Sequence, residues 1–174
     1  MDNFAEQLVK KNESSSDRTK RVVLLICGIL MTLALAVTAF LQLGQPLMAI
    51  LGFLLAVSGG VGTYVMFTNS FVEYEYTFTN GELDIDKIIA QRRRQEMLST
   101  DVKKFTAFGQ YNEDMEETDD MTVVIASDNI ASHEYYADFQ HEEYGSTRLI
   151  FAPDERMLEN IVRSLPAKIR SSMQ

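Results

Sequence analysis

The chain has very few of the side chains that catalytic and metal sites need. Its 174 residues include one cysteine, Cys27, and two histidines, His133 and His141. A lone cysteine excludes an intramolecular disulfide framework and a multi-cysteine metal site. The two histidines would lie about 26 Å apart on one extended strand, too far to share an ion, and no glycine-rich phosphate loop occurs. We expect no catalytic residue, no metal and no cofactor.

Charge is absent from one long block. Residues 22–67 contain no Asp, Glu, Lys, Arg or His, whereas the flanks carry every charge of a chain whose net charge is −9. A pI near 4.7 disfavours nucleic-acid binding, which depends on a field of Lys and Arg. The lack of ionisable groups inside the block also argues against a transporter, a proton relay or a channel.

The uncharged block predicts two membrane-spanning helices, residues 22–43 and 47–67. The first run would extend about 33 Å as a helix, which matches a hydrocarbon core of about 30 Å. Between the runs, Gly44 suits a left-handed helix end and Pro46 suits the first turn of the next helix. A cleaved signal peptide is the rival interpretation, but the apolar core is long and a second run follows directly. We expect a retained antiparallel hairpin.

Basic residues set the expected orientation of this hairpin. Five of them precede the first run, and the turn between the runs has none: Lys10, Lys11, Arg18, Lys20 and Arg21. Because Lys and Arg favour the cytoplasmic side, we expect an integral protein of the inner membrane with both termini in the cytoplasm. Residues 1–21 would form a cytoplasmic N-terminal segment.

Both predicted helices carry small residues at intervals of four. The stripes are Gly28, Thr32 and Ala36 on the first helix and Gly52, Ala56 and Gly60 on the second. Small residues let helix backbones approach closely in lipid, where van der Waals packing drives association. Two interpretations remain open: the helices of one hairpin pack on each other, or a stripe forms a homodimer face.

From Val72 the pattern alternates with a period of two, as in a half-buried strand. Asn80 and Gly81 supply the positive φ values of a tight hairpin turn. Five further strands are expected at 92–98, 103–108, 121–127, 134–141 and 146–151. With the two strands on either side of the Asn80-Gly81 turn, they make seven antiparallel strands. A C-terminal amphipathic helix follows from Pro153, with Leu158, Ile161, Val162 and Leu165 on one face. The expected class is α+β: a two-helix transmembrane hairpin, then a strand-rich domain over residues 68–174.

These segments carry a family resemblance. The stretch "YEYTFTNGELDI", a basic third strand and the segment "LSTDVKKF" resemble bacterial pleckstrin-homology-like (PH-like) domains of membrane proteins. The whole chain, with its "MDNF" start and its two spans, resembles an uncharacterised family of small Firmicutes membrane proteins. The resemblance implies a seven-stranded PH-like barrel closed by a helix. It implies no activity, and a fold alone does not establish a ligand.

The run from Arg92 to Arg94 is the most distinctive basic feature. As strand residues, Arg92 and Arg94 would share one face. One interpretation pairs them with carboxylates. A second joins them with Lys103 and Lys104 in contact with an anionic lipid head group or a phosphate, and a third places a protein partner there. Residues 68–174 hold 11 Lys and Arg against 21 Asp and Glu, so an anionic membrane repels this domain on average.

The acidic run at residues 112–120 lacks the spacing of a calcium loop, and we expect a solvated loop.

Taken together, the sequence predicts a membrane-anchored, non-catalytic interaction or scaffold module that presents its domain to an unidentified protein or lipid partner. The alternative is an accessory subunit that docks onto a larger membrane complex through the Gly52, Ala56 and Gly60 stripe.

Overall fold

The computed structural model of the protein describes residues 3–11, 15–112, 114, 115, 118, 120–128 and 133–172. The chain divides into two compact units. One consists of residues 13–71. The other combines residues 1–12 with residues 72–174, so the helical unit is inserted within the sequence of the strand-rich one.

The helical unit is an antiparallel hairpin of α1 (Ser15–Leu41) and α2 (Pro46–Asn69). Both helices are long and apolar enough to cross a membrane, as predicted. Pro46 begins α2, where its fixed φ and missing N–H do no harm. Gly44 is not among the glycines with positive φ, so the expected left-handed helix end is wrong; the chain turns instead through a bond from the Gln45 amide to the Gln42 carbonyl, at 2.8 Å.

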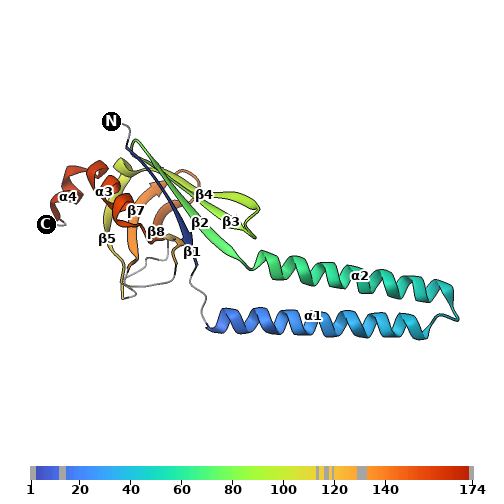
Figure 1. The fold of residues 1–174 in the computed structure, drawn as a ribbon. Coiled ribbons are helices and arrows are strands. Elements are labelled where there is room, and N and C mark those ends of the chain that lie inside the picture. The colour runs from blue at the N-terminus through green and yellow to red at the C-terminus, as the bar shows by residue number, and fades with distance from the viewer. Residues whose placement is uncertain are drawn as a thin grey trace. The chain divides into compact units, whose positions relative to one another are not determined.

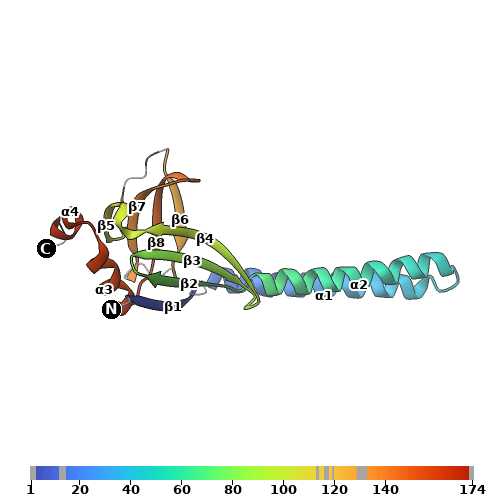
Figure 2. The ribbon, with the colours of Figure 1, turned by 90° about the horizontal axis from the view of Figure 1, so that it is seen from above.

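The first sheet contains β1 (Phe4–Lys10), β2 (Val72–Thr79), β3 (Glu82–Ile89) and β4 (Arg93–Asp101), in that order and antiparallel throughout. Figure 2 shows the four strands side by side. The turn between β2 and β3 has φ of 54° at Asn80 and 102° at Gly81, which confirms the predicted tight turn.

β1 was not predicted. The sequence predicts no strand within the N-terminal segment, residues 1–21, yet Phe4 pairs with Thr79 and Lys10 with Glu73 on either side of the inserted hairpin. The apolar side chain of Phe4 is 47% exposed, whereas that of its small neighbour Ala5 is 2% exposed. Apolar residues therefore lie on both faces of β1, and its sequence does not show the alternation that predicts a half-buried strand. The pairing with β2 makes this segment a strand.

The second sheet contains β5 (Phe105–Gln110), β6 (Thr122–Ala126), β7 (Tyr135–His141) and β8 (Gly145–Phe151), in the order β5-β7-β8-β6. A short 3-10 turn, η1 (Val102–Lys104), separates β4 from β5. β6 pairs with β8 in parallel. The predicted seven antiparallel strands in a barrel are therefore corrected to eight strands, among the described residues, in two separate four-stranded sheets with one parallel pair.

The core of the strand-rich unit lies between the two sheets and α3 (Glu155–Ser164), which packs against β1 and β2 (Figure 1). Asp154 caps α3, since its carboxylate accepts from the Met157 amide at 2.7 Å; the helix thus starts two residues after Pro153, not at it. Of the predicted apolar stripe, Ile161 and Leu165 are buried. After Pro166 the chain continues as the short helix α4 (Ala167–Ser172).

Tyr76 of β2 joins the two sheets by hydrogen bonds. Its hydroxyl donates to the carbonyl of Ala126 on β6 and accepts from the amide of Ala152, which follows β8, at 3.3 Å. Its ring packs edge-on against Phe151 at 5.8 Å between centroids. Burial raises the pKa of Tyr76, so the hydroxyl stays protonated and remains a hydrogen-bond donor to the Ala126 carbonyl.

Candidate functional site

The arginine run lies at the turn between β3 and β4. Ala90 and Gln91 adopt positive φ, 54° and 55°, and the Arg92 amide donates to the Ile89 carbonyl at 3.1 Å. Arg92 belongs to this turn, and β4 starts one residue later. The expectation that Arg92 and Arg94 share one strand face does not hold, because the two left-handed residues close the turn beside Arg92.

Arg94 lies among carboxylates on the outer face of the first sheet. Its guanidinium pairs with Glu75 of β2, and its Nε lies 3.4 Å from Oδ2 of Asp86 on β3. The side chain of Arg94 is 59% exposed and that of Glu75 is 12% exposed, so the arginine covers the carboxylate. Burial raises the pKa of Asp86, and the charges of Glu96 and Asp84 raise it further. For Arg94, these contacts favour the interpretation in which the run pairs with carboxylates.

The two lysines lie beyond the other end of β4. The Lys103 amide donates to Oδ1 of Asp101 at 2.9 Å, and Nζ of Lys104 lies 4.0 Å from the exposed carboxylate of Glu142. The nine residues of β4 extend about 26 Å. The structure therefore does not bring Arg92 and Arg94 together with Lys103 and Lys104 in one patch.

The outer face of the first sheet is strongly acidic. Alternation along β1, β2, β3 and β4 puts these carboxylates on the side away from the core: Glu6, Glu73, Glu75, Asp84, Asp86 and Glu96. The alternating acids of the "VEYEYTFTNGELDID" stretch predict part of this face. Such a surface repels an anionic bilayer, so the sheet face is a poor lipid contact.

The small-residue stripes of α1 and α2 face each other within the hairpin. A Cβ on Gly28 would lie 2.8 Å from Cβ of Thr63, and one on Gly52 would lie 2.6 Å from Cβ of Ala39. These approaches leave no room for a methyl group at either glycine. The predicted residues Thr32, Ala56 and Gly60 also lie along this contact, and Ala36 is half-buried.

Sequence reasoning missed Ala39, which is 1% exposed. It follows Thr32 by seven residues, so the heptad spacing of the stripe was the available signal.

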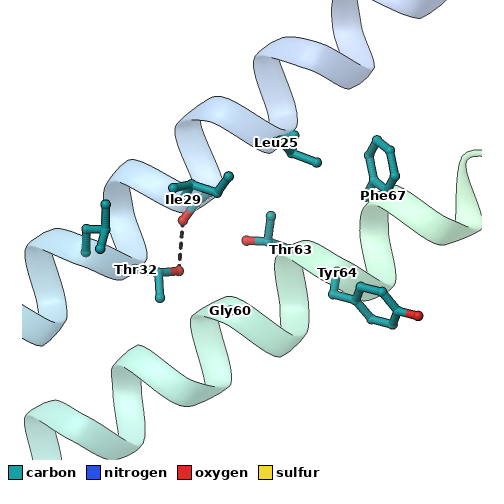
Figure 3. Close-up of a pocket in the computed structure, with 9 residues that line it drawn as sticks. Leu25, Ile29, Thr32, Gly60, Thr63, Tyr64 and Phe67 are labelled. Carbon is teal, nitrogen blue, oxygen red and sulfur yellow. Dashed lines mark hydrogen bonds between the residues drawn. The ribbon is translucent and has the colours of Figure 1, made fainter.

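An open groove of about 290 Å³ lies between α1 and α2. Its lining is apolar apart from a tyrosine and two threonines: Leu25, Gly28, Ile29, Thr32, Leu33, Gly60, Thr63, Tyr64 and Phe67. Figure 3 shows Leu25 and Phe67 toward one end and Thr32 with Gly60 toward the other. The threonine hydroxyls donate to carbonyls of their own helices, Thr32 to Gly28 at 2.8 Å and Thr63 to Gly59 at 2.9 Å.

Two polar hollows lie in the strand-rich unit. One, of about 330 Å³, is lined by Lys104, His141 and neighbouring polar side chains of β4 and the β7–β8 turn. His141 is committed to that turn, because its Nδ1 accepts from the amides of Glu143 and Tyr144 at 3.1 and 3.3 Å. The other, of about 420 Å³, contains His133 beside three carboxylates, Asp128, Asp154 and Glu155.

Within the part of the chain that the structure describes, no three His, Cys, Asp or Glu side chains gather as a metal site would require. His133 and His141 line different hollows, and Cys27 is exposed on α1. The acidic run at 112–120 falls partly on residues 113, 116, 117 and 119, which lie outside the described residues.

Comparison with known proteins confirms the bacterial PH-like family that the sequence resembles. The family described as Bacterial PH-like domain (DUF6106) matches residues 1–171, a span that includes β1, the whole hairpin and both sheets. No curated protein matches the chain, and no solved structure does. The chain belongs to the Bacterial PH-like domain (DUF6106) family.

Proposed function

We propose that this protein is a membrane-anchored, non-catalytic module that presents its PH-like domain at the cytoplasmic face of the inner membrane, where the domain binds a protein or lipid partner. The single observation that carries the proposal is the insertion of an apolar helical hairpin between two paired strands. β1 precedes α1, β2 follows α2, and β1 pairs along its whole length with residues 73–79 of β2.

This connectivity supports a defined topology. Strands β1 and β2 can pair only where both ends of the hairpin emerge on the same side of the bilayer. Two spans satisfy that requirement, since each crossing reverses the side. The basic residues that precede α1 favour the cytoplasm for that side: Lys10, Lys11, Arg18, Lys20 and Arg21.

Cysteine accessibility tests the topology. In a Cys27→Ser background, Gln45→Cys places a thiol in the turn between the helices, and Glu142→Cys places one on a side chain that is 96% exposed in the domain. In intact cells a membrane-impermeant maleimide is expected to label Gln45→Cys, and to label Glu142→Cys only after lysis. Labelling of Glu142→Cys in intact cells would exclude a cytoplasmic domain.

The alternative proposal is an accessory subunit whose helices dock onto a larger membrane complex. Ala39 of α1 packs against Gly52, so this part of the predicted stripe has no free surface for a second docking. Gly62 on α2, by contrast, is open: a Cβ added there would meet no atom within 4 Å, and this glycine would lie on the docking face.

Crosslinking of the full-length protein in its native membrane separates the two roles. The accessory role predicts that Gly62→Leu abolishes the crosslinked partner. The module role predicts that Gly62→Leu keeps the partner, and that charge reversals on the domain surface remove it.

A further inference from the structure

The groove between α1 and α2 suits a hydrocarbon chain. It is lined mainly by aliphatic and aromatic side chains (Figure 3), and the hydroxyls of Thr32 and Thr63 are bonded to their own helices. A ligand group that accepts hydrogen bonds would lose its bonds to water on entering and would find no donor in these two hydroxyls, since each already donates to a carbonyl. An acyl chain makes no hydrogen bonds to water, so it loses none on entering the groove.

The groove leads to a helix end that carries three basic residues, Arg18, Lys20 and Arg21, and one acidic residue, Asp17. Leu25, Gly28 and Thr32 line the groove on α1, and with 3.6 residues per turn the same helix face continues backward to Arg21 and Arg18. Lys20 lies roughly on the opposite side of the helix from Arg18. Two of the basic residues at this end therefore share the face of the groove.

Aromatic contacts connect Arg21 to the groove wall. Its Nη2 donates to the Ser70 carbonyl at 2.7 Å, and its guanidinium carbon lies 4.3 Å from the centre of the Phe71 ring. Phe71 packs edge-on against Phe67 at 5.5 Å, and Phe67 lines the groove. The positive charge is thus held at the groove mouth, while the side chain of Arg18 is exposed one turn away.

We propose that this groove is a binding site for one anionic phospholipid of the bilayer, with an acyl chain between α1 and α2 and the phosphate at Arg18 and Arg21. Charge complementarity selects this occupant, since basic pockets between membrane helices attract anionic head groups. A second copy in the same groove would bring the same arginines of both copies to one level of the membrane, where like charges repel. The inference rests on the membrane insertion contained in the proposed function.

The apolar half of the site is tested by a matched pair of glycine variants. A Cβ on Gly60 would lie 3.6 Å from Cγ2 of Thr32, an ordinary contact, and a Cβ on Gly62 would meet nothing within 4 Å. Gly60→Leu therefore fills the groove, and Gly62→Leu makes the same change on α2 outside it. The full-length protein is purified in detergent and mixed with phosphatidylglycerol or with phosphatidylcholine of identical chains, and bound lipid is counted by native mass spectrometry.

We expect the unaltered protein and Gly62→Leu to retain one phosphatidylglycerol and Gly60→Leu to retain none, with equal helix content by circular dichroism in all three. Equal retention by Gly60→Leu and Gly62→Leu would overturn the groove as the site. A dimer that dissociates on Gly60→Leu would assign the groove to a second copy instead.

The head-group half is tested by Arg18→Gln against Lys20→Gln. Both changes remove one charge from the same helical turn, but only Arg18 lies on the groove face. We expect Arg18→Gln to lower the preference for phosphatidylglycerol over phosphatidylcholine about fivefold, equivalent to about 1 kcal/mol for one basic group, and Lys20→Gln to leave it unchanged. Because neither residue packs between the helices, this pair remains decisive if Gly60→Leu fails to fold. If the two changes lower the preference equally, the basic helix end attracts anionic lipid without a specific site, and the proposal is refuted.

Carbonate extraction of native membranes keeps the two proposals apart. A protein that stays in the membrane but shows no lipid preference refutes the lipid site and leaves the anchor intact. A protein released by carbonate refutes the anchor and, with it, the site.

Discussion

Removal of the Tyr76 hydroxyl tests whether hydrogen bonds hold the two sheets together. Tyr76→Phe deletes one oxygen and keeps the ring, which is fully buried and packed against Phe151. The change leaves the Ala126 carbonyl without its donor and the Ala152 amide without its acceptor. Any loss of stability therefore reports on these two bonds and not on a cavity.

The size of the effect follows from the cost of an unpaired buried group. A buried donor or acceptor without a partner costs about 1–3 kcal/mol. The bond from the Ala152 amide is long, at 3.3 Å, so most of the effect should come from the Ala126 carbonyl. We expect Tyr76→Phe to lower the free energy of unfolding by about 2 kcal/mol.

Urea unfolding of the full-length protein in detergent, followed by near-ultraviolet circular dichroism, measures the change. Tyr144→Phe is the matched control, because Tyr144 is 38% exposed and its substitution should stay within about 0.5 kcal/mol. If Tyr76→Phe and Tyr144→Phe unfold at the same urea concentration, the hydroxyl does not link the sheets and the reasoning is refuted.

Three further predictions concern the hairpin and the acidic sheet face. Gly28→Val should separate the helices, because its new side chain overlaps the threonine opposite, whereas Gly62→Val should not; distances between spin labels on the two helices measure this. Since the pKa of Asp86 is raised in the folded protein, stability should fall as pH rises from the unfolded pKa through the folded one, and Asp86→Asn should remove this component from urea unfolding series between about pH 4 and pH 7. Arg94→Gln should cost about 1–3 kcal/mol, because it leaves the Glu75 carboxylate, which is 12% exposed, without its cation. Arg92→Gln should cost nothing measurable by the same unfolding assay, and a larger loss at Arg92 than at Arg94 would contradict the observed pairing.

The elements that could be predicted are those set by neighbours in sequence. The two long apolar helices follow from a block without charged residues, and both occur. The alternation of Tyr74, Tyr76 and Phe78 predicts one buried strand face, and all three are buried. Asn80 and Gly81 turn the chain as expected, because positive φ is a property of those residues themselves.

The missed elements depend on distant partners. β1 becomes a strand through its pairing with β2, and its exposed Leu8, at 51%, obscures the pattern that buried Val9, at 6%, would otherwise show. β6 lies parallel to β8 at the sheet edge, and no local pattern distinguishes a parallel edge strand from an antiparallel one. Two sheets in place of one barrel follow from these pairings.

The candidate sites divide in the same way. The sequence placed small residues on both helices, but only the structure decided that Gly28 meets Thr63 and Gly52 meets Ala39, since that register depends on how two helices pack. The sequence alone determined the apolar helical hairpin, the alternating strands, the acidic character and the presence of a basic run, because each depends on side chains close together in the chain. The tertiary structure decided that Arg94 lies against Glu75 of another strand and that β1 completes a sheet interrupted by the hairpin, because contacts between residues far apart in the chain form only when the whole domain folds.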